Sequence, residues 1–345
     1  MIAASWPRAE PLDERLLVVD VDAWSTIDAR IRDLPAHLRA GDLLVVNDAA
    51  TLPASFQART ELGAPIEVRL LARGSDDTTW RAVLFGDRDW RTRTEDRPQP
   101  PQLEAGARVV IGGELVATLS AIDPISPRLV TLHFERAGAA LWSALYRLGR
   151  PVQYAHIEAP LDLWATQTPF ASRPWAVEEP SAGRPLQSRV LAGLRTRGIE
   201  IASLTHAAGL SATGDPAIDR ALPLPERYDI PLATVLAVAR ARRRGTRVVA
   251  AGTTVVRALE GCARDHDGTL VAGEDTTDLH IDGALRLRVV DAILTGLHEP
   301  TASHFRLLEA FAPTSLLAAA YEHAARAGYA NHEFGDSSLI LRHAR

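Results

Sequence analysis

The character of the sequence changes at about residue 55 and changes back at about residue 134. Between these points, short runs of alternating apolar and polar residues are separated by turn residues, which is typical of half-buried strands. Strands are predicted at residues 55–61, 66–72, 79–85, 108–111, 115–122 and 129–134. Because these short strands follow one another without a helix, they predict a small antiparallel β-barrel, with Gly112 and Gly113 forming one hairpin turn.

The segments on both sides of this stretch have a different pattern. Apolar runs at residues 16–20 and 41–48 predict buried strands, and apolar residues at helical spacing predict a helix over residues 24–34. Further along, helices are expected at residues 139–148, 186–197, 232–244, from Thr254 onward and twice within 304–326. Strands are expected at residues 199–205, at Val248 and at Asp291, with a hairpin-like region over 269–290. This alternation of helices and strands indicates an α/β or mixed domain.

We therefore expect an α/β (mixed) core domain with an inserted small antiparallel β-barrel domain. The core is expected to be discontinuous, formed by residues 1–52 and 138–345, and the barrel to span residues 53–137. A polar and proline-rich segment, residues 91–102, predicts a mobile loop on the barrel.

Composition excludes several classes of protein. Lysine is absent, which removes Schiff-base and P-loop lysine mechanisms. Cys262 is the single cysteine, so neither a disulfide framework nor a cysteine-cluster metal site is available, and it is expected to be a small buried hydrophobe. No secretory signal and no apolar run long enough for a membrane helix is visible. We expect a cytoplasmic protein that needs no metal and contacts no membrane.

The segment from Arg247 to Glu260 predicts a ligand pocket. A buried strand ends at Gly252, Thr253 or Thr254 caps the following helix, and apolar residues continue at helical spacing. Such a turn presents free backbone N–H groups and hydroxyls, which suit a carboxylate or a hydroxyl-rich ligand, although it also serves any α/β protein as a change of direction. We expect Arg257 and Glu260 to form a pair at i, i+3 across the pocket wall.

Other polar clusters lie at predicted strand ends or in turns. Asn47 and Asp48 close the second strand, where they either turn the chain or bind ligand. His206 stands at a strand end, as a structural hydrogen-bonding group or as a general base. The remaining clusters are the turn Glu179-Pro-Ser-Ala-Gly183, with Ser181, and the loop Leu294-Thr-Gly-Leu-His-Glu-Pro300, with His298. His298 and His304 are too few to argue for a metal site.

Taken in order, these clusters resemble a known family. Asn47-Asp48, the β insertion, Pro180-Ser-Ala-Gly183, Thr205-His206, Pro225-Glu-Arg-Tyr228, Gly252-Thr-Thr-Val-Val-Arg257, Thr295…His298-Glu-Pro300 and Gly335-Asp336 run in sequence along the chain. The series resembles the S-adenosylmethionine:tRNA ribosyltransferase-isomerase family of queuosine biosynthesis. The architecture of that family, an α/β core with an inserted β-barrel, agrees with the pattern of predicted strands and helices.

The resemblance implies an enzyme that uses S-adenosylmethionine as a ribosyl donor. The family attaches the ribosyl moiety to 7-aminomethyl-7-deazaguanine at the tRNA wobble position and isomerises it, forming epoxyqueuosine and releasing adenine and methionine. S-adenosylmethionine is thus a co-substrate, tRNA is the expected partner, and the family suggests a monomer.

The resemblance also suggests roles for individual residues. His206 suits the base that removes a proton next to the sulfonium, and Glu226 or Asp336 suits the acid or a ribose ligand. Thr253, Thr254 and Arg257 suit the methionine carboxylate or hydroxyls. The wider donor site is expected to comprise Asn47, Asp48, Ser181, Gly183, Tyr228, Gly252 and His298.

The chain departs from the family pattern mainly where an acceptor would bind. Ala49-Ala50 replaces a threonine and an arginine, Leu224 replaces a histidine, and Ala330-Asn-His-Glu-Phe334 replaces a cluster of aromatic residues and arginine. Aromatic and arginine side chains are those that stack on a flat base and contact phosphate. Two alternatives therefore stand beside the main hypothesis: ribosyl transfer to a small molecule without tRNA, and a non-catalytic homologue that binds a nucleoside or RNA.

Overall fold

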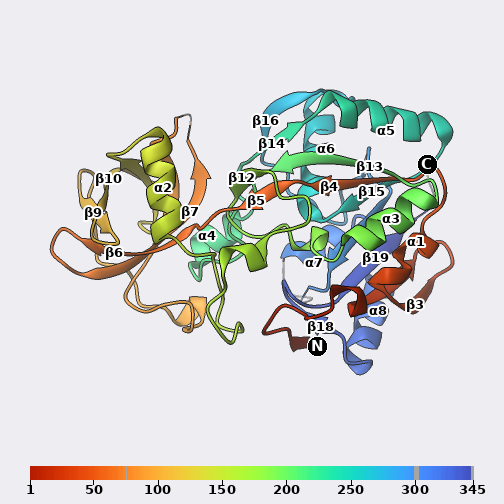
Figure 1. The fold of residues 1–345 in the computed structure, drawn as a ribbon, viewed down its shortest axis with the longest axis horizontal. Helices are drawn as coiled ribbons and strands as arrows, with labels where there is room; N and C mark the ends of the chain where they lie inside the picture. Colours follow the sequence, from red (N-terminus) through yellow and green to blue (C-terminus); the bar gives the residue numbers. More distant parts are fainter. Residues whose placement is uncertain (75, 299–302, 343–345) are drawn as a thin grey trace.

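The computed structural model describes residues 1–74, 76–298 and 303–342 and contains two bodies (Figure 1). A barrel lies at one end of the long axis, and a larger sheet-based core that contains both termini lies at the other. The α-helices of the described chain are α1 (Leu34–His37), α2 (Gly138–Leu148), α3 (Ser188–Thr196), α4 (Pro216–Ala221), α5 (Leu232–Arg244), α6 (Thr253–Asp265), α7 (Ser303–Leu308) and α8 (Thr314–Arg326).

The barrel is closed, and its strands are those that the alternating pattern predicts. They follow the order β10-β11-β8-β7-β6-β9, and every neighbouring pair is antiparallel. Their bounds are β6 (Ser55–Thr60), β7 (Pro65–Arg73), β8 (Thr79–Phe85), β9 (Arg108–Ile111), β10 (Leu115–Ile122) and β11 (Leu129–Phe134). Gly112 and Gly113, both with positive φ, join β9 to β10 as expected.

The core contains a nine-stranded sheet of order β16-β14-β13-β4-β15-β17-β19-β2-β3. Its strands are β2 (Arg15–Asp20), β3 (Ser25–Arg30), β4 (Leu43–Asn47), β13 (Glu200–His206), β14 (Glu226–Ile230), β15 (Val248–Ala251), β16 (Gly273–Thr277), β17 (Ala292–Gly296) and β19 (Ser337–Leu341). The central strands β13, β4, β15 and β17 are parallel. Two small pairs complete the sheets: β1 (Ile2–Ala3) with β18 (Ala330–Asn331), and β5 (Ala49–Thr51) with β12 (Arg173–Ala176).

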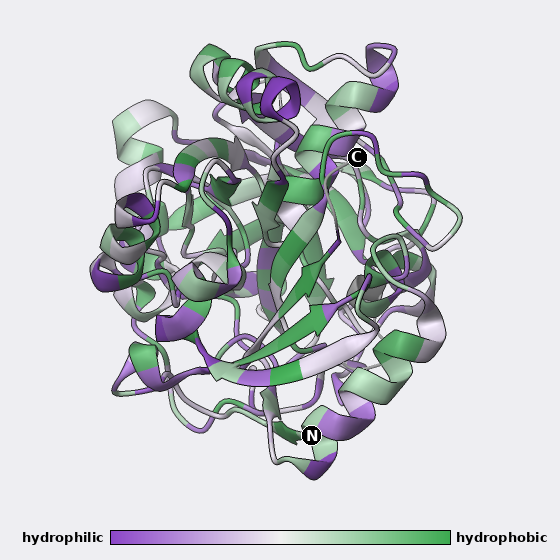
Figure 2. Ribbon diagram, turned by 90° about the vertical axis from the view of Figure 1, so that its right-hand side faces the viewer, coloured by the Kyte–Doolittle hydropathy of each residue, from purple (hydrophilic) through white to green (hydrophobic). Residues whose placement is uncertain are grey.

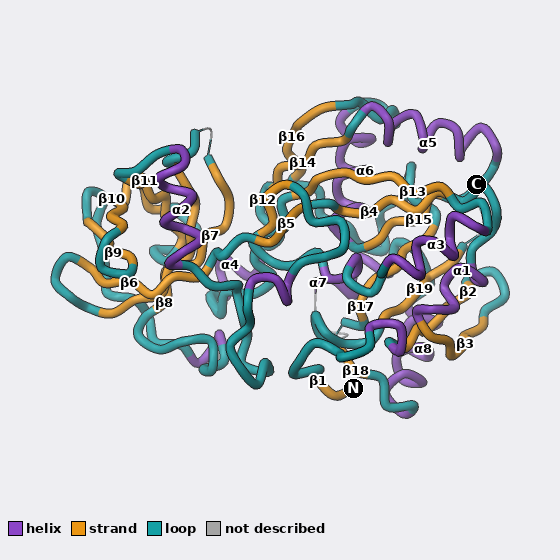
Figure 3. Tube along the Cα trace, viewed as in Figure 1, coloured by secondary structure: helices purple, strands orange, loops and turns teal. Residues whose placement is uncertain are grey.

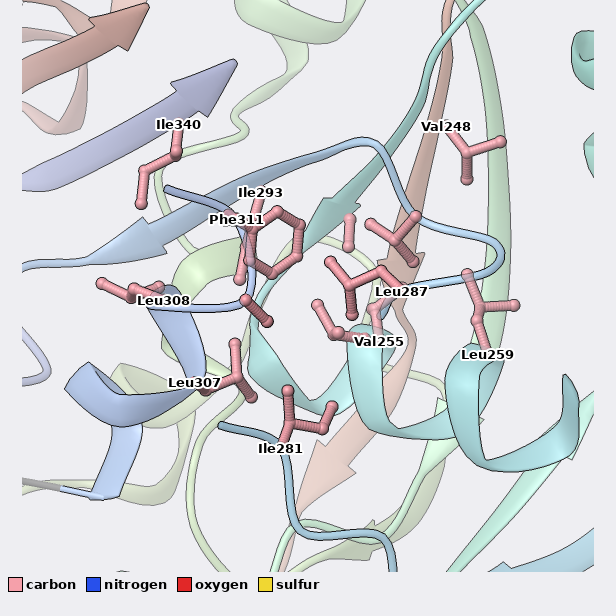
Figure 4. Close-up of a cluster of buried hydrophobic side chains, with 14 of the residues drawn as sticks. Val248, Val255, Leu259, Ile281, Leu287, Ile293, Leu307, Leu308, Phe311 and Ile340 are labelled. Carbon is pink, nitrogen blue, oxygen red and sulfur yellow. The ribbon is translucent and has the colours of Figure 1, made fainter. Parts of the chain in front are cut away.

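Helices cover both faces of the central sheet, which explains why its strands are continuous apolar runs. Leu43 and Val45 of β4 pack in the cluster that contains α5, α6 and α8, whereas Leu44 and Val46 pack with α1 and α3. Figure 2 shows the hydrophobic strands inside the helical layers, and Figure 4 shows Val255 of α6 among the buried side chains. The core is thus α/β in architecture, as predicted.

Two local predictions are wrong. Residues 25–30 form the strand β3 rather than a helix, because they pair along the whole length of β2 at the edge of the sheet. Residues 269–290 form no hairpin; only β16 is a strand there, and it pairs with β14. The segment 91–102 is a loop, as predicted, with the short 3₁₀ helix η3 (Thr94–Asp96); Arg97 after it forms a buried ion pair with Glu67, and the mobility of the loop stays a prediction.

The chain returns from the barrel through a mostly irregular segment, residues 149–172, whose one helical turn is η4 (Leu163–Thr166) (Figure 3). Before it, Leu141, Ala144 and Leu145 of α2 pack into the barrel cluster. The division into residues 1–52 with 138–345 and residues 53–137 remains a proposal, and the packing of α2 favours a boundary after Leu148. Within the described ranges, no helix has the length and apolar character needed to cross a bilayer.

Candidate active site at the edge of the central sheet

Most residues proposed from the sequence meet at one edge of the central sheet, the edge formed by the carboxyl ends of its parallel strands. Parallel strands β4, β13, β15 and β17 end there, and β19 runs antiparallel to β17 and so begins there. The register therefore places Asn47, His206, Gly252 and Asp336 near the same edge. In open α/β sheets, ligands bind outside the carboxyl ends of the parallel strands.

Asn47 connects three of these strand ends. Its Nδ2 donates to the carbonyl of His206 at 3.0 Å and to Oγ1 of Thr254 at 3.2 Å. Its Oδ1 accepts from the backbone N–H of His206 at 2.9 Å and of Ala49 at 3.0 Å. The next residue, Asp48, accepts from Oγ1 of Thr205 at 2.6 Å. Both side chains therefore hold the strand ends in place, and their contact with a ligand stays a prediction.

The predicted threonine cap of α6 does not form: Thr253 and Thr254 lie inside the helix, and the N-cap residue is Gly252, so the first turn has no side-chain cap. Gly252 has φ +96°, and a Cβ there would lie 3.3 Å from Cβ of Ala182. Ala182 belongs to the short helix η5 (Ser181–Gly183), so the Ser181–Gly183 turn packs directly against the start of α6. An uncapped helix N-terminus presents backbone N–H groups and partial positive charge, which suit a carboxylate.

His206, Glu226 and Arg257 form a buried cluster at the start of α6. The side chain of His206 is fully buried, and Oε2 of Glu226 lies 3.4 Å from its Nε2. Glu226 pairs with Arg257, whose Nε donates to the carbonyl of Leu279 at 3.1 Å. Oε1 of Glu226 accepts from the N–H of Gly209 at 2.8 Å. Within the described part of the chain, neither ring nitrogen of His206 has a hydrogen-bond partner.

Burial sets the protonation of this cluster. Desolvation, with repulsion from Arg257, holds the pKa of His206 well below its ordinary value, so the ring is neutral at neutral pH. Desolvation raises the pKa of Glu226, and attraction to Arg257 opposes that rise. A neutral imidazole without a partner beside a carboxylate is a group able to accept a proton.

Glu226 also lines a cleft between the barrel and the core. The cleft is bounded by Leu71 and Arg81 of the barrel and by Gly209 and Leu210 after β13. His206 is fully buried beside Glu226 and is not among the residues that line this cleft. Tyr228, two residues along β14, points instead into the core, and desolvation raises the pKa of its hydroxyl. The role of Tyr228 in donor binding stays a prediction.

Two further predicted residues lie beyond β17 and before β19. Nε2 of His298 lies 2.9 Å from Oγ1 of Thr295, and Glu299 and Pro300 lie outside the described residues. Asp336 accepts from the N–H of Ala330 at 2.8 Å and of Arg15 at 3.0 Å, and it pairs with Arg8. These contacts fix the loop before β19, and a catalytic role for Asp336 stays a prediction.

The expected pair of Arg257 with Glu260 does not form. Glu260 instead accepts from the backbone N–H groups of residues 288–290 at 2.7 to 2.8 Å, while Arg257 turns toward Glu226. Cys262, which lies in α6, is buried as predicted.

Sequence reasoning missed two groups that the fold brings to this edge. Glu14 and Glu179 are buried carboxyls on either side of Arg184, and desolvation raises the pKa of each to about 7. Glu179 is the first residue of the Glu179–Gly183 turn that stood out in the sequence, although its carboxyl was given no role there, whereas Glu14 carries no local signal. The second group comprises His156, His332 and Glu333. His156 is too far from the other two in the sequence for any spacing motif to connect them.

Comparison with known proteins agrees with this architecture. A sequence model of the family described as "Queuosine biosynthesis protein" matches residues 1–340. The S-adenosylmethionine:tRNA ribosyltransferase-isomerase of Moorella thermoacetica is 35% identical over 340 residues, covering 96% of this chain and 94% of that protein. The protein of the same name from Burkholderia mallei is 34% identical over 322 residues, covering 92% and 85% respectively.

A solved structure shows the same fold. The crystal structure of S-adenosylmethionine tRNA ribosyltransferase from Thermotoga maritima superimposes with a TM-score of 0.53 at 24% identity, covering 99% of this chain and 96% of that one. The sequence match extends over nearly the whole chain, through both the barrel and the core. The chain therefore belongs to the queuosine biosynthesis protein family.

Proposed function

We propose that this chain is an S-adenosylmethionine:tRNA ribosyltransferase-isomerase. It would transfer the ribosyl moiety of S-adenosylmethionine to 7-aminomethyl-7-deazaguanine at the tRNA wobble position and isomerise it to epoxyqueuosine, releasing adenine and methionine. The observation that carries this proposal is the full-length match to relatives of that name.

The start of α6 is the proposed donor site. Its uncapped N–H groups, with Thr253 and Thr254, suit the methionine carboxylate of S-adenosylmethionine. The Ser181–Gly183 turn forms a wall beside it, and Arg257 is held by Glu226 one helical turn further on. Asn47 orients Thr254 directly through its amide.

The His206–Glu226 pair is the proposed proton acceptor. The positive sulfonium acidifies the adjacent carbon, so a weak base in a desolvated site suffices to remove the proton. His206 suits this base because its ring is neutral and its nitrogens lack partners among the described residues. Glu226 faces the cleft and suits either the acid that assists adenine or a ribose ligand.

The proposed acceptor is tRNA bound across the cleft between barrel and core. We also propose that the chain acts in the cytoplasm as a monomer and requires no metal for the transfer itself. The family's acceptor-side aromatic residues and arginines are replaced in this chain, which makes the acceptor the part of the proposal to test first.

The test is incubation of the protein with S-adenosylmethionine and tRNA carrying 7-aminomethyl-7-deazaguanine, with adenine and methionine followed by chromatography. Release that requires this tRNA supports the proposal, and tRNA with guanine at the wobble position is the matched control. Release without any tRNA would establish a small-molecule acceptor instead. No release and no donor binding would overturn the enzymatic proposal in favour of a non-catalytic protein.

Salt dependence provides an independent check on the partner. A protein that contacts several phosphates loses affinity steeply as salt rises, because binding releases counterions. The affinity for tRNA should therefore fall strongly between low and physiological salt. An absent or salt-insensitive association would contradict the tRNA proposal.

A further inference from the structure

His156, His332 and Glu333 each direct one potential ligand atom to a common place outside the proposed catalytic cluster. All three ligand atoms lie within 4.8 Å of one another. His156 belongs to the segment that returns from the barrel, and the other two belong to the loop between β18 and β19. Two imidazoles and one carboxylate form a ligand set that zinc binds in proteins, with a fourth position left to water.

The separation of two of the ligand atoms fits such an ion. Nε2 of His156 and Oε2 of Glu333 lie 3.0 Å apart in a hydrogen bond that an ion would replace, and two ligands of a tetrahedral ion with bonds of about 2.0 Å lie roughly 3.3 Å apart. The rings of His156 and His332 are stacked, with centroids 4.2 Å apart and an angle of 26° between their planes.

The surroundings hold the ligands in place. The loop is fixed by Asp336 and by Gly335, where a Cβ would lie 2.5 Å from the carbonyl of Asn331. Arg184 donates to the backbone carbonyl of Glu333, while the Glu333 carboxylate contacts Nε2 of His156. Phe334, the next residue, packs against Ile157, the neighbour of His156. At metal sites, contacts around the ligands hold them in a fixed orientation in the same way.

Charge and access also favour a cation. The buried carboxyls of Glu178 and Glu179 lie within electrostatic range of Glu333, so positive charge added to that of Arg184 favours ionisation of these carboxyls. The side chains of His156 and Glu333 are 18% and 26% exposed, which gives an ion a route from solvent.

We propose that His156, His332 and Glu333 bind one divalent transition-metal ion of the zinc class, which fastens the segment returning from the barrel to the core beside the sheet edge. The ion is assigned no step in the ribosyl transfer. The proposal is independent of the acceptor, since it rests on these three side chains alone.

The test is titration of chelator-treated full-length protein with ZnCl₂ by calorimetry, with Co²⁺ absorption as a second readout. We expect one equivalent to bind, a tetrahedral Co²⁺ spectrum, and a zinc-dependent rise in the thermal midpoint. H156Q, H332N and E333Q should each weaken zinc binding by about tenfold or more. Asparagine is chosen at position 332 because His332 has φ +69°, a conformation that asparagine tolerates.

The matched control is His323→Ala. His323 also lies against a carboxylate, 2.9 Å from Asp28, but it belongs to none of the three-ligand groups among the described residues. Its removal should leave zinc affinity unchanged. If the thermal midpoint of a ligand variant in the presence of chelator equals that of the wild type, the variant is folded. Absence of stoichiometric zinc binding by the wild type, or full binding by both H156Q and H332N, would overturn the proposal.

Discussion

At the scale of single residues, the start of α6 concentrates the unusual features of the molecule. Gly252 adopts a conformation that L-residues avoid, His206 is buried without a hydrogen-bond partner within the described chain, and Glu226 carries a raised pKa. Unsatisfied buried groups and burial-shifted pKa values cost stability, and they cluster at functional sites. These costs support the choice of this corner as the site of binding and chemistry.

Gly252→Ala should weaken binding of S-adenosylmethionine. The new Cβ meets Ala182, and the positive φ adds strain of about 1–3 kcal/mol, so the Ser181–Gly183 turn and the helix start move apart. Calorimetric donor affinity and the thermal midpoint measure the two effects. Gly245→Ala is the control, because Gly245 has φ +65° with no atom near a Cβ and caps the far end of α5. Equal donor affinity in both variants would contradict the proposed donor site.

His206→Ala should abolish adenine release while donor binding stays detectable, because the base is lost and the start of α6 remains. Single-turnover adenine release and donor calorimetry separate these outcomes. His266→Ala, at the other end of the same helix, should retain turnover. Full turnover by His206→Ala would exclude the base role.

At the scale of elements, the barrel contains a cluster of buried charged residues that the alternating pattern of its strands does not predict. Glu67 accepts from Nε of Arg69 at 2.5 Å and from Arg97 at 2.7 Å, and Ser55 donates to it at 2.9 Å. Arg69, Arg97 and Arg128 also lie over the ring of Phe85. The loop residue Arg97 is thereby drawn into the barrel.

Glu67→Gln should destabilise the protein by about 3–5 kcal/mol, because two buried guanidinium groups lose their counter-ion. Burial opposes ionisation of Glu67, but Arg69 and Arg97 prevail and hold its pKa below the ordinary value. Its contribution is therefore present at neutral pH and is lost as pH falls through that lowered pKa. Urea unfolding at neutral pH measures the loss. Glu135→Gln, which removes an exposed partner of Arg108, is the control and should behave as wild type; equal stabilities would contradict the prediction.

At the scale of the whole molecule, segments from both ends of the chain and from its middle meet around Arg184. Glu14 precedes β2, Glu179 precedes η5, and Glu333 accepts from Arg184 through its carbonyl. Desolvation outweighs the attraction of Arg184, so the pKa of both Glu14 and Glu179 rises to about 7. The folded state therefore holds protons that the unfolded chain releases.

This linkage predicts a pH dependence. Between pH 4.5 and about 7, these two carboxyls make stability fall as pH rises, because the folded state binds more protons than the unfolded state. Glu179→Gln should be more stable than wild type at pH 7.5, by at most about 3 kcal/mol, and similar at pH 4.5. Unfolding at both pH values measures the difference, with Glu322→Gln at an exposed position of α8 as control. A variant that gains nothing at pH 7.5 would contradict the linkage.

The sequence by itself determined the barrel strands, several strands of the core and the turn at Gly252, because alternation, apolar runs and glycine conformation are local properties. It also indicated the family through the order of its motifs. Only the tertiary structure decided that residues 25–30 extend the sheet, since the edge of β2 offers backbone partners to a segment whose spacing suits a helix. It likewise decided that Arg257 pairs with Glu226 rather than Glu260, and that His156 meets His332 and Glu333. Such contacts join residues distant in sequence, and burial around them sets their protonation, so no local pattern carries them.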